Sequence, residues 1–174
     1  MRRVLFILGQ LTDEDSVWIA NNGEKINFPI DFTFIQAGKP SDYLFIILDG
    51  SAAVQMGSGK HLAKVQSGDI LGEMSFIDST PPMASVITDS ECNVLRIKKT
   101  LIKAKLLADD GFSGRFYKAL AMFLADRMRN TILSMGFDVD SQNDVDVDEL
   151  DEDVLDSIHL AGIRFEQILK LMKG

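Results

Sequence analysis

The residues with the clearest chemical potential lie in the segment 68–86, where a glycine-containing turn leads into Gly72-Glu73-Met74-Ser75. This tetrapeptide has the form of a short helical turn, and the free backbone N–H groups at a helix start favour a bound anion. Glu73 stands among apolar neighbours and needs a hydrogen-bond donor if it is buried. A ribose hydroxyl is a chemically suitable donor. The segment therefore predicts a site for a small ligand with hydroxyl and anionic groups.

The same segment resembles the phosphate-binding cassette of the cyclic nucleotide-binding domain family, which includes the catabolite activator protein and the regulatory subunits of protein kinase A. In that family, Gly-Glu-Leu-Ala/Gly is followed by Arg-x-Ala-x-Val nine or ten residues after the glutamate. Here Gly72-Glu73-Met74-Ser75 and Ala84-Ser85-Val86 stand at these positions. Residues 34–50 are similar to the glycine-turned strand pair that precedes the cassette in the family. We call residues 68–86 the cassette.

The resemblance covers about residues 12–135 and implies roles for individual side chains. It implies that Gly72 lets the ligand approach the backbone, that Glu73 accepts from the ribose 2′-hydroxyl, and that amides near Ser75 and Ala84 face the cyclic phosphate. A long helix would serve as lid and dimer seam. Its polar residues would reach the pocket or base, or stand exposed on a dimer helix. The candidate ligand-binding residues are Gly72, Glu73, Met74, Ser75, Pro82, Met83, Ala84, Arg127 and Thr131.

The cassette departs from the family at the arginine, whose position falls on Pro82, or on Met83 after a shift of one residue. Residues 65–95 contain no Lys, Arg or His but five Asp or Glu. A charge-assisted hydrogen bond contributes about 1.5–3 kcal/mol, or about ten- to a hundredfold in affinity, and a helix N-terminus offers about 0.3–1 kcal/mol, reaching about 2 when partly buried. We therefore expect that the site binds cyclic AMP or cyclic GMP weakly, or that it binds a different small ligand. The third alternative is that a cation from elsewhere in the chain replaces the arginine, and Arg127 is the best candidate for it.

The elements that must position these residues are short strands. Apolar or alternating segments are separated by turn residues throughout residues 26–97, and such a series is typical of an all-β sandwich or roll. Together with the resemblance, this predicts a mainly β fold, a double-stranded β-helix (a jelly-roll-like β-roll). The expected strands are residues 32–36, 43–48, 51–56, 61–65, 85–88 and 93–97.

Helices are expected on both sides of the roll. Thr12 has the form of an N-cap for a helix that ends near Gly23. After the roll, apolar residues at three- and four-residue spacing predict a short helix, a long C-terminal helix to about residue 135, and an amphipathic tail helix. The apolar stripe of the tail helix must pack on the roll, on the long helix or on a partner chain. The expected organisation is an N-terminal helical segment 1–25, a roll with C-helix 26–137, an acidic linker 138–149 and a tail helix 150–174.

The charge distribution limits the partners. Residues 1–137 hold 15 basic and 15 acidic side chains, so the 11 acidic and 3 basic residues of 138–174 account for the net charge of −8. An acidic tail repels phosphate backbones, and it replaces the helix-turn-helix module that follows the long helix in the catabolite activator family. No DNA partner is expected.

The acidic linker also resembles an EF-hand calcium loop. Asn143 stands where the loop needs glycine, Gln142 is long for its position, and no second hand is present, so a solvated linker is the favoured interpretation. The oxygen ligands of such a loop would be Asp138, Asp140, Gln142, Asp144, Asp146 and Glu149.

The sequence contains no pattern that favours a catalytic site or a membrane span. His61 and His159 are about a hundred residues apart and form no metal motif, and no nucleophile–base pair is visible. No apolar run approaches the roughly 20 residues of a membrane span, and residues 4–8 are too few for a signal peptide. We expect a cytoplasmic, non-enzymatic ligand-sensing or regulatory module that forms a homodimer and requires no cofactor. The alternative is a protein-interaction subunit with a vestigial pocket.

Overall fold

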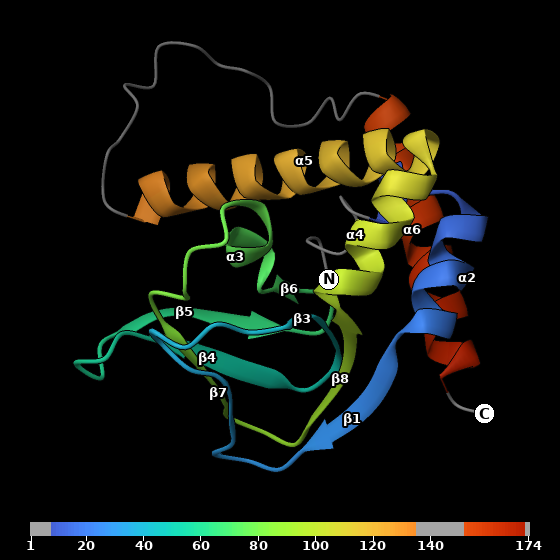
Figure 1. Cartoon of the computed structure of the whole chain (residues 1–174). Coiled ribbons are helices and arrows are strands. Elements are labelled where there is room, and N and C mark those ends of the chain that lie inside the picture. The colour runs from blue at the N-terminus through green and yellow to red at the C-terminus, as the bar shows by residue number, and fades with distance from the viewer. Residues whose placement is uncertain (1–7, 135–151, 173–174) are drawn as a thin grey trace, which may run out of the picture.

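The computed structural model describes residues 8–134 and 152–172, which form a roll of two antiparallel sheets flanked by helices (Figure 1). One sheet has the strand order β1-β8-β3-β6 and the other β2-β7-β4-β5. This confirms the predicted mainly β roll. The strands are β1 (Glu24–Phe28), β2 (Thr33–Ile35), β3 (Tyr43–Asp49), β4 (Ser51–Gln55), β5 (His61–Gln66), β6 (Ile70–Leu71), β7 (Ser85–Thr88) and β8 (Cys92–Lys98).

Two of these strands, β1 and β6, were missed by the sequence analysis. β1 alternates polar and apolar side chains and lies at the edge of its sheet, where it pairs with β8 alone. β6 consists of Ile70 and Leu71, which pair with Ile46 and Phe45 of β3. A strand of two residues has no period to detect, and its existence depends on the partner strand.

The central strand β3 explains how the roll is joined to the helices. Its residues 44–48 are all buried, because successive side chains point to opposite faces of the sheet and both faces are covered. Leu44, Ile46 and Leu48 belong to the core cluster shared with the helices. Phe45 and Ile47 belong to the cluster between the two sheets. A continuous apolar run of this kind indicates a strand that is buried on both sides.

The helices occupy two places around the roll. Long α5 passes over the roll and the short helix α3, and α2 lies beside α6 at one end of the molecule (Figure 1). The N-cap predicted at Thr12 is present, and it forms a capping box with reciprocal hydrogen bonds between Thr12 and Asp15. The helices are α2 (Asp13–Asn22), α3 (Glu73–Ile77), α4 (Lys99–Ala108), α5 (Asp110–Ser134) and α6 (Glu152–Leu171).

The tail helix α6 packs within the same chain, and its neighbour is α2, which the sequence analysis did not consider. Ala161 and Ile168 are fully buried in the helical core. Arg164 donates to Asp13 at 2.7 Å and to the carbonyl of Leu8 at 2.9 Å. The division into four segments stays a prediction, and residues 138–149 lie outside the described residues. Within the described part of the chain, no helix combines the length and apolar character needed to cross a membrane.

Candidate ligand pocket

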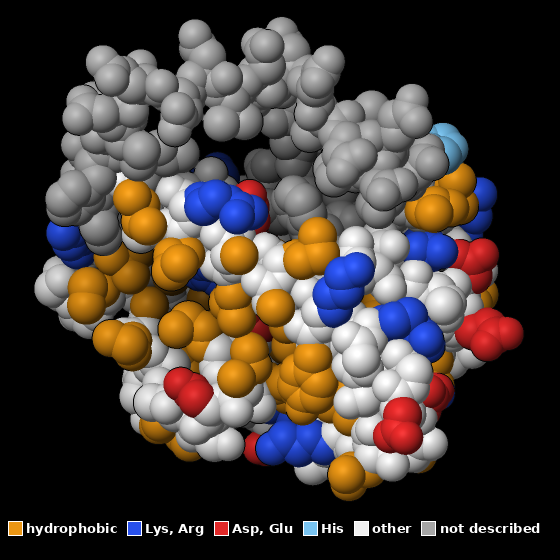
Figure 2. All heavy atoms as spheres, turned by 90° about the horizontal axis from the view of Figure 1, so that it is seen from above, with side chains coloured by type: hydrophobic (Ala, Val, Ile, Leu, Met, Phe, Trp, Pro, Cys, Tyr) orange, Lys and Arg blue, Asp and Glu red, His pale blue; other side chains and the backbone are white. Residues whose placement is uncertain are grey.

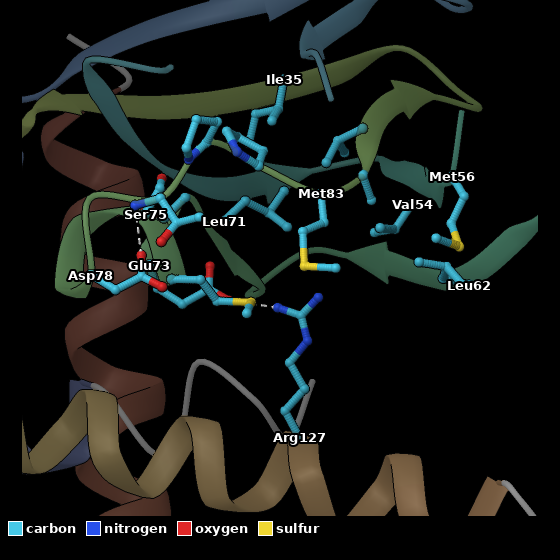
Figure 3. Close-up of a pocket in the computed structure, with 17 residues that line it drawn as sticks. Ile35, Val54, Met56, Leu62, Leu71, Glu73, Ser75, Asp78, Met83 and Arg127 are labelled. Carbon is cyan, nitrogen blue, oxygen red and sulfur yellow. Dashed lines mark hydrogen bonds and ion pairs between the residues drawn. The ribbon is translucent and has the colours of Figure 1, made fainter. Parts of the chain in front are cut away.

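A cavity of about 300 Å³ lies between the cassette, the sheet β2-β7-β4-β5 and helix α5 (Figure 3). Side chains from the strands form one wall and the cassette forms another, and among the described residues of α5 it is Arg127 that reaches in from the lid side. The described lining residues are Ile35, Val54, Met56, Leu62, Leu71, Gly72, Glu73, Met74, Ser75, Asp78, Thr80, Pro81, Pro82, Met83, Ala84, Val86 and Arg127.

Gly72 gives the cassette its shape at the entry to α3. Its φ of 87° is a left-handed conformation that favours glycine. A Cβ atom at this position would also lie 2.9 Å from the carbonyl oxygen of Tyr43 on the neighbouring strand. Both constraints exclude a side chain, so Gly72 sets the direction in which Glu73 enters the cavity.

Glu73 is bound to Arg127 across the cavity. The Nη1 atom of Arg127 lies 2.7 Å from Oε1 of Glu73, and 3% of the Glu73 side chain is exposed against 28% of Arg127. In Figure 3 Arg127 extends from α5 toward the cassette. Burial raises the pKa of Glu73 above its ordinary value, and the positive charge of Arg127 offsets only part of this effect. The pair therefore connects the lid helix to the cassette through a carboxylate that is costly to ionise.

A second cation, Lys99, contacts the cassette through Ser75 and was missed by the sequence analysis. It lies in the first turn of α4, is 9% exposed, and donates to the hydroxyl of Ser75 at 2.7 Å. Burial lowers the pKa of Lys99, with a further contribution from the nearby charge of Lys103. Lys99 is not among the residues that line the cavity. Its sequence position directly after β8 carried no signal of a contact with Ser75.

The loop at the arginine position of the cassette offers few groups for an anion. Pro81 and Pro82 have no backbone N–H, and the carbonyl oxygen of Pro82 accepts from the N–H of Gly38 at 2.7 Å. Met83 is 76% exposed and points into the cavity region in Figure 3. The hydroxyl of Ser85 accepts from the N–H of Ala37 at 3.0 Å. The loop is thus held against the β2–β3 turn and presents apolar side chains.

Eight of the nine ligand-binding residues expected from the sequence line the cavity. The ninth, Thr131, is not among the described lining residues. The hydroxyl of Thr131 donates to the backbone oxygen of Arg127 at 2.8 Å, one turn earlier in α5. The six residues of the calcium-loop interpretation lie outside the described residues. Among those that are described, no group of three or more His, Cys, Asp or Glu is placed to hold a metal ion.

Comparisons with known proteins show which family the β-roll resembles. Residues 25–109 match the family model described as the cyclic nucleotide-binding domain. The cAMP-dependent protein kinase regulatory subunit of Neurospora crassa is 30% identical over 101 residues, which cover 58% of this chain and 26% of that protein. The chain thus spans about a quarter of the length of this curated relative.

Solved structures agree on the fold. A cyclic nucleotide-binding domain from Methylobacillus flagellatus superposes with a TM-score of 0.70 at 24% identity, over 77% of this chain and 81% of that chain. The catabolite activator protein of Thermus thermophilus superposes with a TM-score of 0.61 at 20% identity, over 72% and 59% of the two chains. The resemblance to the cyclic nucleotide-binding domain family is therefore confirmed over residues 25–109, which match its family model.

Proposed function

We propose that this chain is a non-enzymatic, ligand-sensing regulatory module whose cavity holds a small molecule under α5 and binds cyclic nucleotides weakly. The observation that carries the proposal is the contact between Arg127 and Glu73 inside the cavity. It supports the proposal because it joins the helix expected to act as lid to the cassette. The absence of a cation from the cassette supports the weak affinity for a cyclic phosphate.

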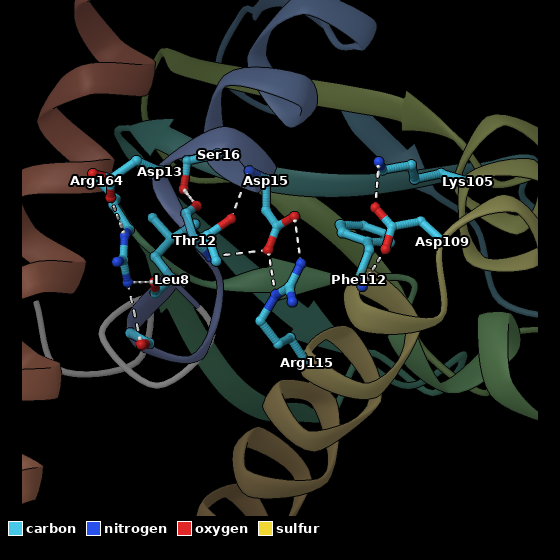
Figure 4. A network of polar contacts seen from close by, with 11 residues as sticks. Leu8, Thr12, Asp13, Asp15, Ser16, Lys105, Asp109, Phe112, Arg115 and Arg164 are labelled. Carbon is cyan, nitrogen blue, oxygen red and sulfur yellow. Dashed lines mark hydrogen bonds and ion pairs between the residues drawn. The ribbon is translucent and has the colours of Figure 1, made fainter.

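A ligand in the cavity would act on the rest of the molecule through α5. Near the start of this helix, Arg115 binds Asp15 of α2 at 2.7 Å (Figure 4). α2 in turn carries Asp13, which binds Arg164 of α6. A ligand that changes the position of Arg127 therefore acts on a helix that is bound directly to α2 and, through α2, to α6. It shifts the equilibrium between two positions of α5 only by its difference in affinity for them.

The outer face of α5 supports the proposed homodimer. Tyr117, Met128 and Ile132 are 49%, 63% and 39% exposed, and their spacing puts them on one side of the helix, away from Arg127. Figure 2 shows hydrophobic side chains gathered on the face seen from above, the side on which α5 lies in Figure 1. Apolar side chains along a helix are suited to packing against a second copy. Analytical ultracentrifugation of wild type and Met128→Glu tests this: the dimer is expected to dissociate in the variant, and a wild-type monomer contradicts it.

Isothermal titration with cyclic AMP and cyclic GMP tests the ligand-sensing function. We expect measurable heat only near millimolar nucleotide, because the principal anion contact of the family is missing. Heat that is absent at such concentrations, together with an unchanged melting temperature, leaves the protein-interaction subunit with a vestigial pocket as the better description.

The variant Arg127→Ala separates two roles of this arginine. Because its guanidinium is bound to Glu73, we expect the variant to change the affinity for cyclic AMP by less than about threefold. The loss of one charge-assisted hydrogen bond to the ligand would lower the affinity by about tenfold or more. A loss of about tenfold or more would show that Arg127 is the substitute cation considered from the sequence.

A further inference from the structure

We infer that the ligand of this cavity is an uncharged, mainly apolar organic molecule rather than a nucleotide or another anion. The inference rests on the proposed function, since it names the class of ligand that the same cavity takes. Three observations carry it: the chemistry of the walls, the charges that reach the cavity, and the backbone of the loop at the arginine position.

The walls of the cavity are apolar on both sides. Ile35, Val54 and Val86 come from three strands of one sheet, and Leu71 comes from β6 of the other. Methionines are flexible and polarisable, they adapt to irregular shapes, and their sulfur atoms make favourable contacts with aromatic rings. The volume of about 300 Å³ is at the lower end of the range of roughly 300–1,000 Å³ for small-molecule sites. The side chains that close the apolar wall are Met56, Leu62, Met74 and Met83.

The charged groups at the cavity disfavour an anion. The described lining residues include two carboxylates, Glu73 and Asp78, and one guanidinium, Arg127. An anion that took Arg127 for itself would leave Glu73, which is 2% exposed, without its ion-pair partner. The buried carboxylate would then have to take up a proton or stay charged without that partner, and either outcome lowers the affinity for the anion. A neutral ligand leaves the pair intact and can still form a hydrogen bond with either member.

The loop at the arginine position has fewer donors for an anion than the family's pattern provides. Its two successive prolines, Pro81 and Pro82, supply no N–H groups. The buried cation Lys99 donates to Ser75 and is not among the lining residues. At the arginine position itself the loop therefore offers neither a cationic side chain nor a proline N–H to an anion, and Lys99 does not line the cavity.

A matched pair of fluorescent probes tests the inference with the full chain. N-phenylnaphthylamine is neutral, and anilinonaphthalene sulfonate has the same ring system with one negative charge. We expect the neutral probe to bind at least about tenfold more tightly, which corresponds to about 1.4 kcal/mol. Met83→Arg places a cation at an exposed position of the loop and is expected to raise the affinity for the sulfonate by about tenfold or more, with Met83→Gln as its uncharged control. Leu107→Gln, on the surface of α4 and 88% exposed, is the control for binding to exposed apolar side chains and should leave both affinities unchanged.

The outcomes separate this inference from the proposed function. Equal affinities, or a preference for the sulfonate that Leu107→Gln does not alter, overturn the neutral-ligand inference and leave a ligand-sensing module in place. Loss of probe binding in Leu107→Gln also overturns it, because the probe then marks the surface of α4. If neither probe nor cyclic nucleotide binds the wild-type chain, the proposed function fails as well.

Discussion

Two buried carboxylate–arginine pairs hold α5 in place, and they differ in how completely the carboxylate is satisfied. Asp15 pairs with Arg115 in the helical network (Figure 4), and Glu73 pairs with Arg127 at the cavity (Figure 3). Both pairs close at 2.7 Å, and the two carboxylate side chains are 4% and 3% exposed. Distance and burial alone therefore do not distinguish them.

The hydrogen bonds around the carboxylates do distinguish them. Asp15 accepts from two nitrogens of Arg115, at 2.7 and 3.1 Å, and from the backbone N–H of Thr12 at 2.9 Å. Burial alone would raise the pKa of Asp15, but these hydrogen bonds outweigh it and hold the pKa below its usual value. Glu73 accepts from Arg127 through one oxygen, and burial raises its pKa. The first pair has the character of a fixed structural tie, and the second that of a contact that can open.

The largest expected effect is the loss of stability when each arginine is removed. Arg115→Met leaves Asp15 buried and charged, and we expect the free energy of unfolding to fall by about 2–3 kcal/mol, less than for a fully buried pair because Arg115 is 35% exposed and Thr12 still donates to Asp15. Arg127→Met should cost about 1 kcal/mol, because Glu73, with its raised pKa, takes up a proton more readily than Asp15 does. Urea unfolding of both variants at neutral pH measures the difference. Equal losses would remove the distinction between the two pairs.

The pH dependence of stability should have opposite signs for the two carboxylates. The lowered pKa of Asp15 contributes stability that is present above its unfolded value of 3.8 and is lost as the pH falls through the folded pKa. The raised pKa of Glu73 contributes stability that is full below its unfolded value of 4.5 and is lost as the pH rises through the folded pKa.

These slopes are measurable by comparing the wild type with Asp15→Asn and with Glu73→Gln between about pH 3 and pH 7. Each group contributes a slope of at most about 1.4 kcal/mol per pH unit. As the pH rises across this range, the wild type should gain stability relative to Asp15→Asn and lose it relative to Glu73→Gln. The same sign in both comparisons would contradict the assignment.

Lys99 extends the comparison to a buried cation, with a smaller expected effect. Ser75→Ala leaves its ammonium group buried without the hydroxyl, which should cost about 1–2 kcal/mol. Lys99→Met removes the charge together with its need for a partner, so we expect a cost below about 1 kcal/mol. Thermal unfolding of the two variants shows which cost is larger. A larger cost for Lys99→Met would mean that the ammonium stabilises the cassette through more than Ser75.

The sequence was informative where local rules determine the structure. Turn residues and alternating segments predicted six strands of the roll, and Thr12 predicted the start of α2. Motif spacing led to the cassette and to Arg127. The pairing of Arg127 with Glu73 joins residues 54 positions apart. It depends on where α5 lies along the cassette, and the apolar periodicity of a helix does not fix that register.

Contacts decided by tertiary packing were the ones that could not be predicted. The position of Lys99 against Ser75 depends on how α4 leaves β8. The packing of α6 on α2 depends on which of several apolar faces lies nearest, and an apolar stripe does not specify its partner.

The central claim is that this cavity lies at the cassette of a cyclic nucleotide-binding fold but lacks the arginine that provides the family's anion contact. Isothermal titration of cyclic AMP into wild type, Pro82→Arg and the uncharged control Pro82→Gln tests it most directly. The account predicts that Pro82→Arg binds about ten- to a hundredfold more tightly than the other two, the gain from one charge-assisted hydrogen bond of about 1.5–3 kcal/mol. Tight binding by the wild type that the arginine does not improve would contradict it.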